Sequence, residues 1–465
     1  MHHSWQYVLC IVLLMADLIY SGLQYYHQPL DGDISWNLVP AEEVNHVLAD
    51  PFGIAAWATP TTYPNPNRFF CHYGFRVYFR SAPLLLQRLV DPVTSVYLAS
   101  ALAKLLVHAA LLYLLAVLIV GRVRGGLVVV GFMTLLTPFF QAAGYRSYMG
   151  IIDPSVTYTF FYALPTALTM LFMIPFVRHL YHGFGWPVAW WRHVILALLA
   201  VVVCLSGPLN PGIVLVLSAT WLSGELLRRG LVGTMSYLRS LPRSLLLLGF
   251  WVAVLAGYSL FVGRYNSLSE VATVPLLERY GRLPEGVYQQ FFQKLGFPLL
   301  FGVLLLFHCL SRFGKASSGE DLWRCYKWLG GFCLLYLLLL PLGGWRAYRP
   351  YTLRYDTILP VTLSLLWLYG RGALTVWGQL RGRPLREQVG YVVLLVGIGL
   401  VFTNADRAET VAHSCEAVTL RALELAAPDT IFLRTDCPVM SWGTPVDPTT
   451  AADNRVLLRH WNIID

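Results

Sequence analysis

The chain has 465 residues, of which 56% are hydrophobic and only 13% are charged, with a mean hydropathy of +0.56. Soluble globular chains carry about 25% charged residues. This composition excludes an ordinary soluble enzyme and indicates a polytopic membrane protein. The net charge of +9 does not imply a nucleic-acid partner, because in membrane proteins the position of basic residues matters more than their sum.

Eleven apolar runs approach the roughly 20 residues that a membrane-spanning helix needs. We therefore expect an all-α polytopic protein with about eleven transmembrane helices. Only the short stretch 207–211, Gly-Pro-Leu-Asn-Pro, separates the fifth run from the sixth. The runs cover residues 6–23, 92–120, 126–143, 156–177, 193–209, 212–227, 245–262, 296–310, 328–342, 355–369 and 389–402.

Basic residues concentrate in five alternate short loops, which the positive-inside rule places in the cytoplasm. We therefore predict a cytoplasmic N-terminus and an extracytoplasmic C-terminus, with the short loops favouring a bacterial inner membrane. The first run is expected to be a retained helix, because residues 1–6 lack the Lys and Arg of a signal peptide. The basic residues are Arg122 and Arg124; Arg178 and Arg192; Arg228, Arg229, Arg239 and Arg243; Arg312, Lys315, Arg324 and Lys327; and Arg371, Arg381, Arg383 and Arg386.

The first outer segment, residues 24–91, begins with two acids, Asp31 and Asp33, one glycine apart. The next residues predict a helix broken at Asp50. A second helix, residues 68–90, interleaves aromatic residues with arginines at helical spacing, which indicates an amphipathic interfacial helix. The alternative is a helix packed on the bundle.

A later outer loop holds Asp153, followed by Pro154. This pair is typical of a helix start, and capping alone would explain the acid.

The outer loop at residues 343–360 combines arginines with aromatic residues. Arginine forks suit phosphate oxygens, and aromatic rings suit sugars or lie at headgroup depth. A binding site for a sugar phosphate is one interpretation, and an aromatic belt with headgroup-bound arginines is the other. The loop contains Trp345, Arg346, Tyr348, Arg349, Tyr351, Arg354 and Tyr355.

With its many spans and long first outer loop, the sequence over residues 1–404 resembles the GT-C superfamily of membrane glycosyltransferases. The acids of "LDGDISW" stand where those enzymes carry an essential acid. The resemblance implies transfer of a sugar from a polyprenyl-phosphate donor to an acceptor on the extracytoplasmic face, in glycan synthesis for the cell envelope. It implies Asp33 or Asp31 as the base, of which we favour Asp33 because it adjoins the helix starting at Ile34.

The same resemblance implies Asp153 as a second acid, the three loop arginines as donor-phosphate ligands, and Trp345, Tyr348 and Tyr351 as sugar-stacking residues. A base would deprotonate the acceptor hydroxyl, and arginines would stabilise charge on the leaving phosphate. No cofactor is firmly implied, although Asp31 could hold a divalent cation. The chain has neither a plain Asp-Glu pair nor a WWD-type motif. Simple helix capping by Asp31 or Asp33 is the competing explanation.

The tail, residues 405–465, is predicted to form a small αβ cap on the outer side. Residues 407–427 predict a helix, residues 429–436 a strand, and residues 454–464 a second strand or a short helix. Cys415 and Cys437 either form a disulfide in an oxidising compartment or remain free thiols.

Charged residues within the spans suggest a different function. Asp17 lies in the first run, and Lys104 and His108 lie in the second. Intramembrane charges are costly and often functional. A structural Asp17–Lys104 ion pair is the simplest explanation, and a transporter or flippase of a lipid-linked or anionic substrate is the functional one. A non-catalytic membrane scaffold is the third hypothesis. Membrane lipids and a lipid-linked sugar are the expected partners.

Overall fold

The computed structural model describes residues 4–39, 42–59, 63–123, 126–142, 149–267, 274–312, 316–346, 348–425, 436–444, 446 and 448–465. Across these ranges every regular element is helical. The β-pairing there is limited to two isolated bridges, Tyr63 with Asn266 and Arg346 with Arg349.

Seven helices of the described chain are long and apolar enough to cross a membrane, and two bent helix pairs raise the number to nine. Five of the seven are single elements: α1 (Ser4–Tyr26), α6 (Pro92–Val120), α12 (Arg243–Gly263), α16 (Tyr355–Leu380) and α17 (Leu385–Thr403). The sixth joins α8 (Val156–Tyr158), η2 (Thr159–Ala163) and α9 (Leu164–Leu180), and the seventh joins α15 (Ala316–Leu339) and η4 (Leu340–Gly343).

The expected number of about eleven spans is therefore wrong, although every apolar run lies on a helix. Run 126–143 forms α7 (Leu127–Leu136) and η1 (Thr137–Phe139), which are too short. Runs 193–209 and 212–227 lie on α10 (Trp190–Cys204) and α11 (Leu209–Ser240), which meet at 118°. Run 296–310 forms α14 (Gly296–Arg312), which bends by 75° from α13 (Leu276–Val287) and η3 (Tyr288–Phe292).

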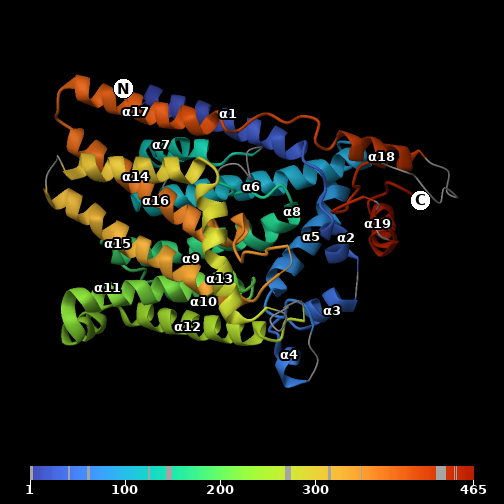
Figure 1. Cartoon of the computed structure of the whole chain (residues 1–465), viewed down its shortest axis with the longest axis horizontal. Helices are drawn as coiled ribbons and strands as arrows, with labels where there is room; N and C mark the ends of the chain where they lie inside the picture. The colour runs from blue at the N-terminus through green and yellow to red at the C-terminus, as the bar shows by residue number, and fades with distance from the viewer. Residues whose placement is uncertain are drawn as a thin grey trace.

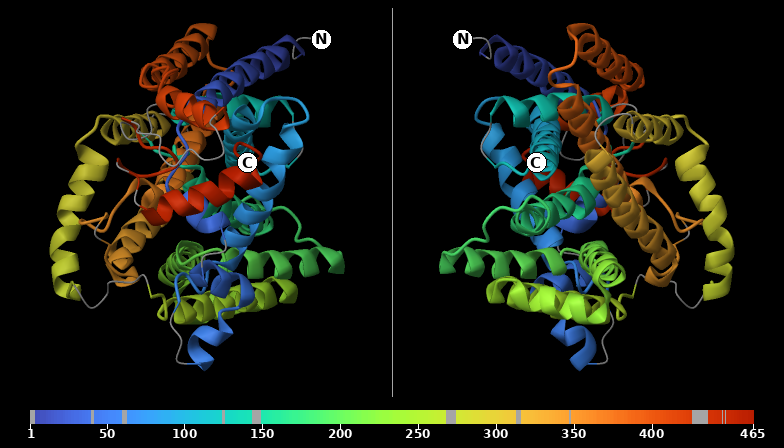
Figure 2. Two further views of the ribbon diagram at one scale, coloured as in Figure 1. Left: turned by 90° about the vertical axis from the view of Figure 1, so that its right-hand side faces the viewer. Right: turned by 90° about the vertical axis from the view of Figure 1, so that its left-hand side faces the viewer.

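The long helices run side by side, and shorter helices from both ends of the sequence gather at one end of this bundle (Figure 1). The view onto that end shows the blue outer segment and the red C-terminal helices lying across it (Figure 2). The two chain termini lie toward opposite ends of the bundle (Figure 1).

The first outer segment forms four short helices: α2 (Asp33–Leu38), α3 (Glu42–Ala49), α4 (Ile54–Ala58) and α5 (Phe69–Leu86). The break at Asp50 is confirmed, since the Asp50 carboxylate accepts from Ile54 and Ala55 N–H at 2.9 and 2.6 Å and so caps α4. The chain also leaves the helical conformation earlier, at Val39. Helix α5 is packed on the bundle, because its Phe75 and Phe79 are fully buried.

The tail adds two helices, α18 (Ser414–Glu424) and α19 (Pro448–His460). The short-helix alternative for residues 454–464 is thus confirmed, and the αβ character expected of the tail is not supported. The strand predicted at 429–436 falls almost entirely outside the described residues. Leu420, Met440 and Trp461 share one hydrophobic core with α2, α5 and α6. We call α18, α19 and residues 436–444 the C-terminal cap.

Candidate functional site

Asp31 is a buried structural carboxylate. Its side chain is 5% exposed and accepts hydrogen bonds from the Thr157 hydroxyl at 2.8 Å and from the Thr157 N–H at 3.1 Å. It also accepts from the N–H of Asp33 at 3.1 Å, the first residue of α2. These bonds tie the first outer segment to the start of α8. Asp31 therefore supports the start of α2, as the capping explanation predicted, and both of its oxygens have protein partners.

Asp33 lies at the same turn but faces a different environment. Its Oδ1 accepts from the indole N–H of Trp442 in the C-terminal cap, at 2.9 Å. Burial raises the pKa of Asp33 and nearby Asp31 adds to the rise, while hydrogen bonds from Trp442 and Tyr158 and the charge of Arg354 oppose it. The net shift is upward, which strengthens Asp33 as a base while leaving it in contact with polar groups.

Tyr158 joins Asp33 to the arginine loop. Its side chain is an electrostatic neighbour of the Asp33 carboxylate, and its ring stacks on Trp442 with centroids 5.8 Å apart. The Arg354 guanidinium lies 4.5 Å from the centre of the same ring. One phenol thus contacts the proposed base, an aromatic residue of the cap and one of the predicted phosphate ligands.

Arg354 is fixed at the start of α16. Its Nε donates to Oδ2 of Asp356 at 2.8 Å, and its backbone N–H donates to the Thr357 hydroxyl at 2.9 Å. Burial alone would lower the pKa of Arg354, but the Asp356 carboxylate overcomes this and the net shift is upward. The guanidinium therefore stays charged at its position beside Tyr158.

Arg346 and Arg349 lie close to one another across an isolated bridge. Burial, with the charges of Arg349 and Arg68, lowers the pKa of Arg346. Burial also acts to lower the pKa of Arg349, but Tyr162, Tyr348 and Asp356 reverse the shift and raise it. No carboxylate of the described chain lies within ion-pair distance of either guanidinium.

Arg68 is a functional candidate that the sequence had placed on an amphipathic helix without a role. Its guanidinium lies 5.2 Å from the ring centre of Phe161 and 5.5 Å from that of Tyr162. Its Nε is buried and has no hydrogen-bond partner among the described residues. A narrow cavity between Arg68, Tyr162 and the α10–α11 bend adjoins it. The set Arg68, Arg346, Arg349 and Arg354 is called the arginine cluster below.

The three predicted sugar-stacking residues lie in two different places. Tyr348 contacts the arginine cluster, since both Arg349 and Arg354 lie 5.1 Å from its ring centre, and it is 57% exposed. Trp345 instead pairs with the Arg282 guanidinium at 5.6 Å and donates to the Pro350 carbonyl at 3.2 Å. The backbone of Tyr351 packs against Gly286 of α13. The contacts of Trp345 and Tyr351 thus lie toward α13.

Asp31 and Asp153 are both acidic neighbours of Lys104. Oδ1 of Asp153 accepts from the N–H of Ser155 at 2.8 Å, and the Ser155 hydroxyl in turn accepts from the N–H of Tyr158 at 3.2 Å. Helix α8 is therefore capped by Ser155, and the prediction that it begins at Asp153-Pro154 is wrong by two residues. The bond from Ser155 to Asp153 supports the turn before Tyr158.

Lys104 is fully buried on α6, where its ammonium donates to the Gln28 side chain at 2.8 Å and to the Pro154 carbonyl. Its acidic neighbours are Asp31 and Asp153, so the ion pair with Asp17 is wrong. Asp17 lies near Asp406 instead.

The described residues hold no group of three or more His, Cys, Asp or Glu side chains placed to bind a metal ion. The Asp31 oxygens accept hydrogen bonds from Thr157 and from the Asp33 N–H, and the divalent cation considered for Asp31 stays a prediction.

Trp442, Tyr158 and Arg68 were not singled out by the sequence. Tyr158 and Arg68 lie in outer segments already marked by acids and arginines, so proximity in sequence offered a weak signal. Trp442 is 409 positions from Asp33, and nothing in the tail marked it.

Comparisons of the chain with family models, with curated proteins and with solved structures each find no match.

Proposed function

We propose that the protein is a membrane glycosyltransferase of the GT-C type, which moves a sugar from a polyprenyl-phosphate donor to an acceptor on the extracytoplasmic face. The observation that carries the proposal is that Asp33 and Arg354 are both neighbours of one residue, Tyr158. A carboxylate of raised pKa near Arg354, which shares the Tyr348 ring with Arg349, suits a reaction that removes a proton at one end and releases a phosphate at the other.

In the proposed reaction Asp33 accepts the proton of an acceptor hydroxyl as that oxygen attacks the anomeric carbon of the donor sugar. The bond between the anomeric carbon and the phosphate oxygen breaks, and its electron pair leaves with the polyprenyl phosphate. The arginine cluster stabilises the phosphate charge that develops. Arg68, Arg346 and Arg349 suit this role because none of them forms an ion pair with a described carboxylate.

The position of the site supports an extracytoplasmic reaction. Asp33 touches the cap that carries the Cys415–Cys437 disulfide, and disulfides persist mainly in oxidising compartments. The same placement supports a cytoplasmic N-terminus, since the N-terminus lies at the opposite end of the bundle (Figure 1). The transporter alternative has less support, because Lys104 holds the turn around Asp31 and Pro154 and makes no pair with Asp17.

The test is a transfer assay with the full chain in lipid nanodiscs, a panel of polyprenyl-phosphate hexoses and pentoses as donors, and octyl glycosides as acceptors. We expect Asp33→Asn to reduce transfer by at least about a hundredfold, the usual scale of a general base, without loss of folding. Asp91→Asn is the matched control, because Asp91 is an exposed acid that caps α6 through Thr94. Full transfer by Asp33→Asn would refute the assigned base.

The phosphate site is tested separately by Arg349→Gln and Arg68→Gln. Both should raise the KM for the donor and leave the KM for the octyl glycoside unchanged. Arg282→Gln serves as the control, because Arg282 is an outer arginine already paired with Glu278. An equal effect of all three substitutions would show that the arginines act through general surface charge.

A further inference from the structure

We propose that Trp442 of the C-terminal cap is a binding platform for a sugar ring of the acceptor, so that the acceptor is itself a saccharide. The inference rests on the proposed function and adds the substrate class on the acceptor side. It also gives the cap a direct part in the site.

Trp442 lies beside the proposed base Asp33, where the acceptor must bind. Its N–H donates to Asp33 Oδ1 at 2.9 Å, so the indole borders the atom proposed to take the acceptor proton. One neighbour of the ring is Tyr158, at 5.8 Å and 26°, yet the side chain remains 58% exposed. A large apolar surface is thus open immediately beside the carboxylate.

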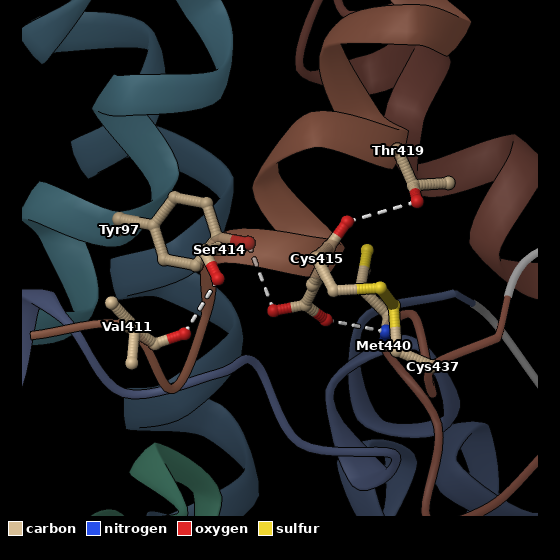
Figure 3. The surroundings of a disulfide bond; sticks show 8 residues. Tyr97, Val411, Ser414, Cys415, Thr419, Cys437 and Met440 are labelled. Atoms are coloured by element: carbon tan, nitrogen blue, oxygen red, sulfur yellow. Dashed lines mark hydrogen bonds between the residues drawn. A yellow bond between two sulfur atoms is a disulfide. The ribbon is translucent and has the colours of Figure 1, made fainter.

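The cap holds this surface firmly. The carboxylate of Glu416 on α18 accepts from the N–H of Met440 at 2.7 Å, the N–H of Leu30 at 2.8 Å and the hydroxyl of Tyr97 at 2.8 Å. Figure 3 shows Tyr97 and Met440 in the surroundings of the Cys415–Cys437 disulfide. The Asn454 amide of α19 also donates to the carbonyls of Val439 and Met440. Trp442 follows two residues after this anchor.

The contact with the first outer segment is equally close. A Cβ placed on Gly32 would lie 2.7 Å from both Cδ1 and the backbone N of Trp442. Only glycine therefore lets residues 31–33 approach the cap so that Asp33 reaches the indole N–H. The glycine between the two acids thus has a geometric purpose that the sequence did not reveal.

The chemistry of the surface favours a saccharide over a lipid headgroup. An indole in an interfacial belt directs its N–H toward headgroups and water, whereas here the N–H is committed to Asp33. What remains is the flat apolar face, which suits the C–H face of a pyranose or furanose ring. A hydroxyl of a ring stacked there would lie next to the Asp33 carboxylate.

The experiment compares Trp442→Ala, Trp442→Phe and Gly32→Ala with a matched control, Trp57→Ala, in nanodiscs. Trp57 is an outer tryptophan of similar exposure on α4, bonded to Tyr258. Octyl hexosides and pentosides are the probes, used as acceptors in the transfer assay and as ligands in saturation-transfer NMR without donor. Thermal unfolding midpoints establish that each variant is folded.

We expect Trp442→Ala to raise the KM for the octyl glycoside about tenfold, the scale of one aromatic contact, and to abolish the NMR signal, with the donor KM unchanged. Trp442→Phe keeps a ring face and should retain the signal while kcat falls. Gly32→Ala should resemble Trp442→Ala, and Trp57→Ala should resemble the wild type.

Equal glycoside KM and NMR signal in Trp442→Ala and the wild type would overturn the inference, as would loss of the signal in Trp442→Phe. The two proposals fail in different ways. Transfer that survives Asp33→Asn refutes the assigned base, whereas transfer that depends on Asp33 but not on Trp442 refutes only the platform. A wild type that binds no glycoside and transfers no sugar refutes both.

Discussion

Asp31 and Thr157 are joined by two hydrogen bonds, from the Thr157 hydroxyl at 2.8 Å and from its backbone N–H at 3.1 Å. This pair separates the roles of two acids that are almost adjacent in sequence. Asp31 ties the first outer segment to the start of α8. Asp33, two residues later, instead accepts a hydrogen bond from Trp442. The fold therefore presents one carboxylate and uses the other as structure.

The first prediction is that Asp31→Asn and Thr157→Val both destabilise the protein. Each substitution removes a buried hydrogen bond, and Asp31→Asn also removes a charge close to buried Lys104. We expect losses of about 1–3 kcal/mol for the hydrogen bonds and more where charge is lost. Thermal unfolding midpoints measure the effect, and the double variant should lose less than the sum of the two. An unchanged midpoint for Asp31→Asn with abolished transfer would instead make Asp31 the base.

The second prediction concerns Lys104. Replacing it by Met leaves the Pro154 carbonyl and the Gln28 side chain without their donor and leaves Asp31 without a nearby cation. Breaking such a buried arrangement costs about 3–5 kcal/mol, so Lys104→Met should unfold at a markedly lower temperature. Asp17→Asn serves as the comparison, because Asp17 forms no ion pair with Lys104. Normal stability of Lys104→Met with loss of anion flux in liposomes would favour the transporter hypothesis.

The sequence predicted the helices well, because continuous apolar runs allow little else in a bilayer. It overestimated the number of spans because hydropathy does not show where a helix bends. The α10–α11 bend of 118° lies at a Gly-Pro pair that the sequence displayed, yet the bend also contacts the residues before α5, through the bond from Gly207 N–H to the Asn67 carbonyl.

The site was predicted less completely. Sequence position put Asp33 and the loop arginines on the same side of the membrane, and the fold brings Asp33, Arg354 and Tyr348 together. It could not distinguish Asp31 from Asp33, because the choice depends on which side chain meets Thr157 and which meets Trp442. Those partners lie 126 and 409 positions away, and no local pattern encodes contacts over such separations.

The third prediction is that the disulfide stabilises the cap and its hold on the site. Cys415 and Cys437 are 22 positions apart, and closing a loop of that size contributes about 3 kcal/mol. The double variant Cys415→Ser/Cys437→Ser should therefore show faster trypsin cleavage in the cap and a higher KM for an octyl glycoside. Cys309→Ser is the control, because Cys309 is an exposed free thiol on α14. Identical cleavage rates in both variants would show that packing alone retains the cap.

The last prediction concerns pH. The pKa of Asp33 is raised above its ordinary value of 3.8, first by burial and then by Asp31. As a base, Asp33 must be ionised, so kcat/KM should fall as pH decreases through this raised pKa, and the acid limb should lie above pH 3.8. Trp442→Phe removes a hydrogen bond that favours the ionised form and should move the limb to higher pH.

The raised pKa of Asp33 also determines whether this residue stabilises or destabilises the folded state. A carboxyl with a raised pKa in the folded state contributes stability below its unfolded pKa and loses that contribution as pH rises through the folded value. Above the folded pKa the ionised Asp33 destabilises the fold, so at such pH Asp33→Asn should unfold at an equal or higher temperature than the wild type. A clear drop in the unfolding midpoint of Asp33→Asn above the folded pKa would contradict this, and would place Asp33 with Asp31 among the structural acids.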